Sequence, residues 1–86
     1  MMKKITQNAA LRRINNCLEK RNHKVVKLKQ KQSEYFQRKY AIINDKNKCV
    51  LFISNYLTPW LVEEWLLDKE EYIENELDIK LEFYSS

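Results

Sequence analysis

The sequence predicts a small α+β fold in one domain, residues 1–86, with an N-terminal helix, an antiparallel β-hairpin, a second helix and a C-terminal strand. Three observations lead to this prediction. Apolar residues recur at helical spacing near the start of the chain. Two β-rich apolar runs, at residues 40–44 and 49–54, flank a short polar turn. Thr58 then precedes a proline, as at the start of many helices.

The first helix is expected over residues 7–21, with Thr6 as its N-cap. Its apolar stripe consists of Ala10, Leu11, Ile14, Cys17 and Leu18. A polar set lies on the opposite side: Arg12, Arg13, Asn16 and Lys20. This set is either an ordinary solvated helix face or an anion-binding face, and its spacing does not separate the two.

A basic segment follows the first helix. Residues 24–29 suit a short edge strand, where lysines discourage pairing with other chains, or a basic extension of the helix. Residues 30–39 form a polar connector that carries Tyr35 and Phe36. These aromatic residues, near Lys31, Arg38 and Lys39, either stack on nucleic-acid bases or cover one edge of a small core.

The hairpin has a four-residue loop at residues 45–48. Because the chain contains no glycine, Asn and Asp residues are expected wherever the backbone needs a positive φ. The candidates are Asn22, Asn44, Asp45, Asn47 and Asn55. Both faces of the hairpin are apolar, so both should be covered by other parts of the structure.

The second helix is expected over residues 59–68 or longer. Its core-facing arc consists of Leu61, Val62, Trp65 and Leu66. An acidic and aromatic face on the other side is a candidate partner-binding surface: Trp60, Glu63, Glu64, Leu67, Asp68, Glu70, Glu71 and Glu74. Alternatively, the C-terminal segment covers Trp60 and Leu67. Residues 77–84 alternate apolar and polar side chains, which predicts a strand at the hairpin edge or one paired with a second copy.

Charge divides the chain unevenly. Residues 1–48 hold 14 Lys/Arg against 3 Asp/Glu, whereas residues 49–86 hold 2 against 9. This asymmetry bears on binding partners and association rates, but it says little about the fold.

Catalytic and metal-binding patterns are not evident. His23 has no clear Ser, Cys or Asp partner, and two cysteines with one histidine lack zinc-site spacing. Cys17 and Cys49 are expected to be buried and reduced. We therefore expect neither enzymatic activity nor a cofactor or metal. The polar start and the lack of an apolar run of about 18 residues predict a cytoplasmic protein that does not enter membranes.

One segment carries a family resemblance. Residues 10–15, Ala-Leu-Arg-Arg-Ile-Asn, resemble the opening of a group of small uncharacterised proteins from plasmids, phages and integrative elements of Gram-negative bacteria. The resemblance extends over residues 6–68 through a Tyr-containing strand, an Asp/Asn turn and a short acidic helix. This chain lacks the group's usual glycine before the first strand, has Asn44 in place of an acidic residue, and adds the tail from Leu77. The resemblance implies a mobile genetic context and no particular activity.

Three functions fit these features. The first is a non-enzymatic, anti-CRISPR-type inhibitor that uses the acidic face as a nucleic-acid mimic against a host defence nucleoprotein complex; the comparison with anti-CRISPR proteins is by analogy. The second is a nucleic-acid-binding accessory protein that uses Arg12, Arg13, Lys20, Lys24, Lys27 and Lys29. The third is a self-pairing antitoxin-like or structural protein. The expected partners are a protein or a nucleic acid, and the expected state is a monomer or a homodimer.

Overall fold

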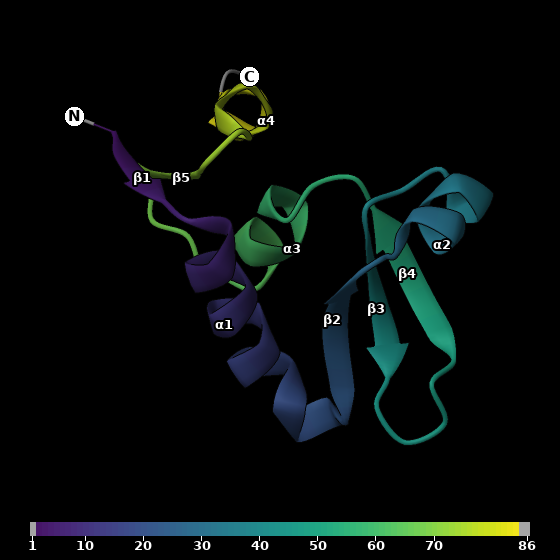
Figure 1. The fold of residues 1–86 in the computed structure, drawn as a ribbon. Helices are drawn as coiled ribbons and strands as arrows, with labels where there is room; N and C mark the ends of the chain where they lie inside the picture. Colours follow the sequence, from purple (N-terminus) through teal and green to yellow (C-terminus); the bar gives the residue numbers. More distant parts are fainter. Residues whose placement is uncertain (1, 85–86) are drawn as a thin grey trace. The chain divides into compact units, whose positions relative to one another are not determined.

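The computed structural model describes residues 2–84 and confirms the α+β class (Figure 1). Helix, hairpin, helix and strand follow one another in the predicted order. The chain forms two compact units, and each is described by itself. The central unit is Asn15–Asn55. The terminal unit combines the chain on either side, residues 2–14 and 56–84 of the described part.

The helix α1, Gln7–Leu18, is shared by the two units, and it continues into a 3-10 turn at Glu19–Arg21. The predicted N-cap is confirmed, because the Thr6 hydroxyl accepts a hydrogen bond of 3.1 Å from the Ala9 N–H. Three members of the predicted apolar stripe are buried, namely Ala10, Ile14 and Leu18. Asn22 ends the turn with a φ of 58°, as expected for a chain without glycine.

The central unit contains an antiparallel sheet in the order β2-β3-β4. Its strands are β2 (His23–Lys27), β3 (Tyr40–Asn44) and β4 (Val50–Ser54), so the strand alternative for residues 24–29 is the one observed. Val25, Tyr40 and Ile42 share one face of the sheet and are buried. The polar connector folds as a helix, α2 (Gln30–Phe36), at the sheet end remote from the β3–β4 turn (Figure 1).

The β3–β4 turn differs from the expectation, because none of its candidates for a positive φ, Asn44, Asp45 and Asn47, adopts one. Lys48, with a φ of 62°, takes the left-handed conformation expected for Asn47. The asparagine side chains explain the difference, because they bind the turn backbone directly. The Asn44 Oδ1 accepts the Lys46 N–H at 2.9 Å, and the Asn47 Oδ1 accepts the Cys49 N–H at 2.9 Å.

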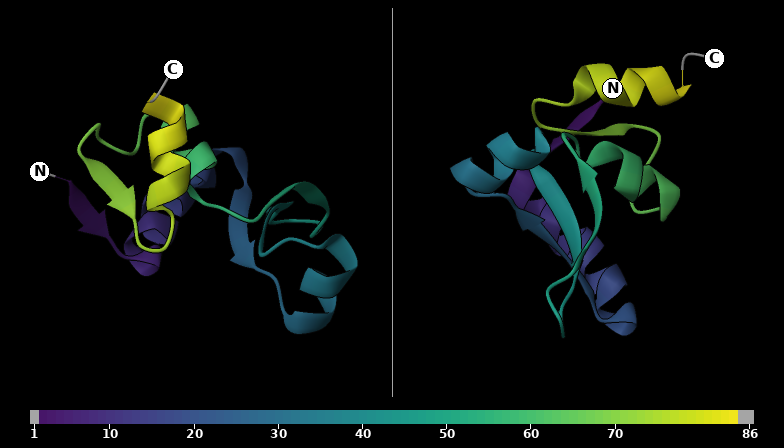
Figure 2. Two further views of the ribbon diagram at one scale, coloured as in Figure 1. Left: turned by 90° about the horizontal axis from the view of Figure 1, so that it is seen from above. Right: turned by 90° about the vertical axis from the view of Figure 1, so that its right-hand side faces the viewer.

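The terminal unit has a short parallel pair of strands, β1 (Lys3–Ile5) and β5 (Glu71–Ile73), which Figure 2 shows side by side. Two helices complete it, α3 (Thr58–Glu63) and α4 (Leu77–Tyr84). Its buried apolar side chains are Ile5, Ala10, Ile14, Leu57, Leu61, Leu67 and Ile73. These residues come from both ends of the sequence, so neither end could form this core alone.

Two predicted elements of the terminal unit were wrong. The second helix does not reach residue 68, because Trp65 adopts a φ of 59° and its N–H donates to the Val62 carbonyl. Residues 77–84 form a helix, and the strand that follows α3 lies earlier, at Glu71–Ile73. In a strand over residues 77–84, Lys80 would lie on the polar face with Asp78 and Glu82. Lys80 is instead almost fully buried and binds backbone carbonyls, an arrangement that a local pattern does not reveal.

No helix within the described residues has the length and apolar character needed to cross a lipid bilayer.

Candidate functional site

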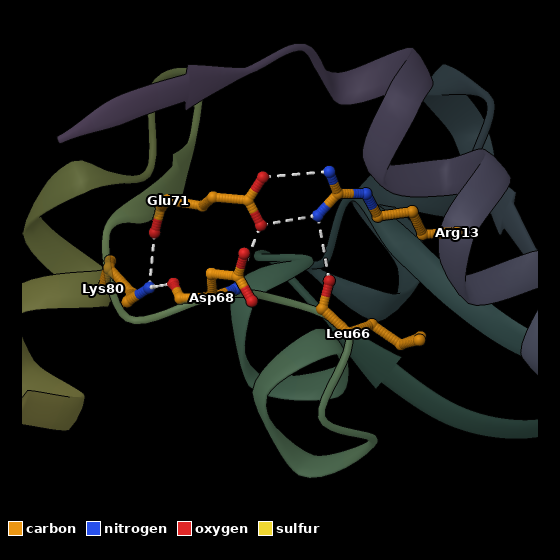
Figure 3. A network of polar contacts seen from close by, with 5 residues as sticks. All are labelled: Arg13, Leu66, Asp68, Glu71 and Lys80. Carbon is orange, nitrogen blue, oxygen red and sulfur yellow. Dashed lines mark hydrogen bonds and ion pairs between the residues drawn. The ribbon is translucent and has the colours of Figure 1, made fainter.

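Several acidic side chains expected on a partner-binding surface instead hold the terminal unit together. Glu71 is buried and forms a two-pronged ion pair with Arg13, with nitrogen–oxygen distances of 2.8 and 3.0 Å (Figure 3). Arg13 also donates to the Leu66 carbonyl at 3.0 Å. The ion pair therefore joins α1 to β5 and to the segment after α3, so neither charge is available as a simple surface charge.

The environment of this ion pair changes the titration of both partners. The hydrogen bonds from Arg13 lower the pKa of Glu71 from 4.5 to about 2, against the opposing effect of burial, and a hydrogen bond from the Asp68 N–H adds to the lowering. The same pair raises the pKa of Arg13 above its ordinary value. Lys80 donates from Nζ to the carbonyls of Asp68 and Glu71, and burial lowers its pKa.

Two further glutamates bind the first N–H groups of helices. The Glu74 carboxylate accepts the Gln7 N–H at the start of α1, at 3.0 Å. The Glu76 carboxylate accepts the N–H groups of Leu57 and Thr58 and the Thr58 hydroxyl, at 2.8 to 3.1 Å. The Thr58 hydroxyl, at the predicted start of the second helix, donates to the Glu76 carboxylate. Sequence reasoning missed the role of Glu76, since the partners lie 18 and 19 residues apart.

The exposed remainder of the predicted acidic face is smaller than expected. Glu63, Asp68 and Glu70 are exposed, whereas Trp60 and Glu64 are half-buried. Leu67 is buried in the core and is not a docking residue. Trp65 shows the opposite error: it was assigned to the core-facing arc, but 93% of it is exposed because α3 ends before it.

The predicted basic residues fall into both units. Arg12 is exposed in the terminal unit, and Arg13 is committed to Glu71. Lys20 follows α1 in the central unit and is also exposed. The other three, Lys24, Lys27 and Lys29, are exposed on or just after β2.

The two units carry opposite net charges. The sequence of the central unit, residues 15–55, holds 10 Lys/Arg against 3 Asp/Glu, a net charge of +7. The remaining residues hold 6 against 9, a net charge of −3. The units separate the charge less sharply than the two halves of the sequence do, because Lys3, Lys4, Arg12 and Arg13 belong to the terminal unit.

The end of the central sheet that carries α2 gathers basic and aromatic side chains. Lys27 pairs with Tyr40 across β2 and β3, and the Leu28 N–H donates to the Lys39 carbonyl at 2.8 Å, so Lys27 and Lys39 lie at the same end. In α2, the Tyr35 ring is 82% exposed and packs edge-on against Phe36, with ring centroids 5.0 Å apart. We call this the α2 surface, and its members are Lys27, Lys29, Lys31, Tyr35, Arg38 and Lys39.

A separate polar depression of about 380 Å³ lies in the central unit. It is lined by Asn15, Asn16, Glu19, Asn22, His23, Lys24 and Asp45. Asn15 has a structural role there, because its Oδ1 accepts the Val25 N–H at 2.7 Å. The hydrogen bond and charge of Lys48 lower the pKa of Asp45.

The structure tests the expectations for the two cysteines and for clusters of metal-ligating side chains. Cys17 is half-buried and Cys49 is exposed, and neither forms a disulfide, so the expectation of two buried cysteines was wrong. Across residues 2–84, no three His, Cys, Asp or Glu side chains lie close enough together to hold a metal ion. The lysine, arginine and tyrosine side chains of the α2 surface are of the types that bind anions and stack on flat rings.

Comparisons with known proteins gave no match: no family model, no curated protein and no solved structure is similar to this chain.

Proposed function

We propose that this protein binds single-stranded nucleic acid through the α2 surface of its central unit. The observation that carries the proposal is Tyr35, an aromatic residue that is 82% exposed on a helix flanked in sequence by the exposed basic residues Lys29, Arg38 and Lys39. An aromatic face lets a base stack whatever its identity, while the surrounding ammonium and guanidinium groups bind phosphates. Single-stranded nucleic acid offers unstacked bases and phosphates together.

Charge supports the same choice of ligand. A net charge of +7 on 41 residues attracts a polyanion at long range and raises its association rate. α2 contains one acidic residue, Glu34. Its carboxylate accepts a hydrogen bond of 3.5 Å from the side-chain amide of Gln30. The basic side chains come from β2, from α2 and from the segment before β3, which gives a phosphate chain several points of attachment.

The residues of this surface favour binding without strong sequence preference. Lysine contacts to phosphates position a nucleic acid but carry no base information, and stacking on a tyrosine tolerates every base. The central unit also lacks a helix-turn-helix arrangement, since α2 connects two strands of a sheet.

The inhibitor hypothesis stays a prediction. Its acidic surface loses Leu67, Glu71 and Glu74 to contacts inside the terminal unit. What remains for a basic partner is Glu63, Asp68 and Glu70, with the exposed Trp65 close to them in sequence. These residues describe a smaller protein-binding surface than the sequence indicated.

The test measures fluorescence anisotropy of a labelled oligonucleotide of about 16 nucleotides. Binding is expected at roughly 50 mM salt and should weaken steeply towards roughly 200 mM, because phosphate binding releases counterions. The variant Lys27→Gln/Lys29→Gln/Lys31→Gln should reduce the slope of log affinity against log salt by about 2, because each neutralised phosphate of a single strand contributes about 0.7 to that slope. Tyr35→Ala should weaken single-strand binding by about 5- to 150-fold, the effect of removing one stacked base.

A matched control separates local binding from net charge. The variant Lys3→Gln/Lys4→Gln/Lys69→Gln removes the same charge from exposed lysines of the terminal unit. It should keep nearly the wild-type slope. Equal reductions in the two triple variants, or no binding of the wild type at roughly 50 mM salt, would contradict the proposal.

A further inference from the structure

β4 presents a row of apolar side chains that the chain leaves uncovered. Val50, Leu51, Phe52 and Ile53 are 43%, 40%, 61% and 39% exposed. Both faces of the hairpin were expected to be covered, and at β4 neither is. β4 also lies at the edge of the sheet, with β3 as its neighbour on one side. An uncovered apolar edge strand is a template for pairing with another strand.

The two edges of this sheet differ in a way that points to a specific use. β2 forms the other edge, and it carries Lys24 and Lys27, which discourage strand pairing. β4 has no charged residue, and no charge occurs anywhere in residues 49–62. The sheet therefore has one protected edge and one unprotected edge.

We propose that β4 pairs antiparallel with β4 of a second copy of this chain, about a two-fold axis near Phe52, to form a six-stranded sheet. The order of strands would be β2-β3-β4 followed by the partner's β4-β3-β2. Both free edges of the joined sheet would then be β2 strands protected by lysine. Because neither of these edges favours pairing with a further strand, assembly stops at the dimer.

Charge near β4 favours the antiparallel orientation of this pair over the parallel one. Lys46 and Lys48 lie in the turn just before β4. In an antiparallel pair centred on Phe52, the two Lys48 residues lie eight residues apart along the seam, about 27 Å at 3.4 Å per residue. That separation exceeds the screening length of about 10 Å, so their repulsion is small. A parallel pair would place the same lysines about 5 Å apart.

The geometry of the sheet also suits this seam. Ile42 lies opposite Phe52, so Phe52 sits at the margin of the buried face and a neighbouring strand would cover it. The register shift beside Ile42 and Ile43 leaves residues 52–54 regularly paired with β3. The regular seam is short, and we therefore expect a dimer that dissociates on dilution.

Sedimentation velocity over a concentration series, without nucleic acid, tests this inference. The wild type should shift from monomer to dimer with increasing concentration. Phe52→Lys should raise the dimer dissociation constant at least tenfold, because it places two ammonium groups at the centre of the seam. Trp65→Lys makes the same chemical change at an exposed site in the terminal unit and should leave the dimer intact.

Cross-linking provides a second readout that does not depend on disrupting the strand. In a Cys17→Ser/Cys49→Ser background, Phe52→Cys should form a disulfide-linked dimer under mild oxidation, because facing residues of antiparallel strands have Cα atoms about 4.5–5.5 Å apart. A wild type that stays monomeric at every concentration overturns the inference, and so does an unchanged dimer in Phe52→Lys. Neither result bears on nucleic-acid binding, which the α2 surface would perform in a monomer as well.

Discussion

The ion pair between Arg13 and the buried Glu71 makes a quantitative prediction about stability and pH. The folded-state pKa of Glu71 is about 2, against 4.5 for an ordinary glutamate, because Arg13 donates two hydrogen bonds to its carboxylate. A difference of about 2.5 between these pKa values corresponds to about 3 kcal/mol of folding free energy. Because the folded pKa is the lower one, this stability is fully present above pH 4.5 and is lost as the pH falls towards 2.

Urea unfolding followed by tryptophan fluorescence measures this effect in the right part of the molecule, since Trp60 and Trp65 both belong to the terminal unit. The free energy of unfolding of the wild type should fall by about 3 kcal/mol between pH 5 and pH 2 beyond any decline shared with other groups. Glu71→Gln should be less stable at neutral pH, since it leaves the Arg13 guanidinium facing a neutral amide. It should also lack that part of the pH dependence.

The exposed neighbour Glu70 provides the control. Glu70→Gln makes the same chemical change one residue earlier and should keep the wild-type pH dependence. If Glu71→Gln retains the full decline between pH 5 and pH 2, a carboxylate other than Glu71 causes the decline, which contradicts the prediction.

Two further predictions concern the ends of α3. Glu76→Gln should destabilise the terminal unit by about 1–3 kcal/mol, because a charged acceptor of the Leu57 N–H, Thr58 N–H and Thr58 hydroxyl becomes neutral. The urea midpoint of this variant should fall below that of the control variant Asp78→Asn. Equal midpoints in the two variants would contradict the capping role of Glu76. Trp65→Gly should leave the free energy of unfolding unchanged or raise it by up to about 1 kcal/mol, since glycine adopts a positive φ without strain and the exposed indole contributes little packing. A clear loss of thermal stability, measured by circular dichroism, would show that the indole is packed.

Much of the fold could be predicted from local patterns. The β-branched and aromatic runs defined β3 and β4, and the Thr6 cap with its apolar stripe defined α1. The helix α2 escaped prediction because its residues are mostly polar and give no apolar stripe. The parallel pair of β1 and β5 escaped because it joins three-residue segments from opposite ends of the chain, and neither is long enough to show periodicity.

The candidate site could likewise be predicted only in part. Exposure of Lys24, Lys27 and Lys29 follows from their position in and beside an edge strand, which was one of the two structures that the sequence allowed for residues 24–29. The separation of the acidic side chains into structural and exposed sets did not follow. Arg13 and Glu71 are 58 residues apart, and only the folded backbone brings them together. An acidic run in a sequence therefore overstates an acidic surface when helix ends and partly buried arginines bind some of the carboxylates.

The central claim is that the α2 surface is where nucleic acid binds, and NMR titration tests it most directly. A ¹⁵N-labelled protein titrated with a short single-stranded oligonucleotide should show backbone amide shifts concentrated in residues 27–39, with Tyr35 among the largest. Residues of the terminal unit, including Glu63 and Glu70, should change little. Shifts concentrated around Glu63, Trp65 and Glu70, or no shifts at low salt, would contradict the account.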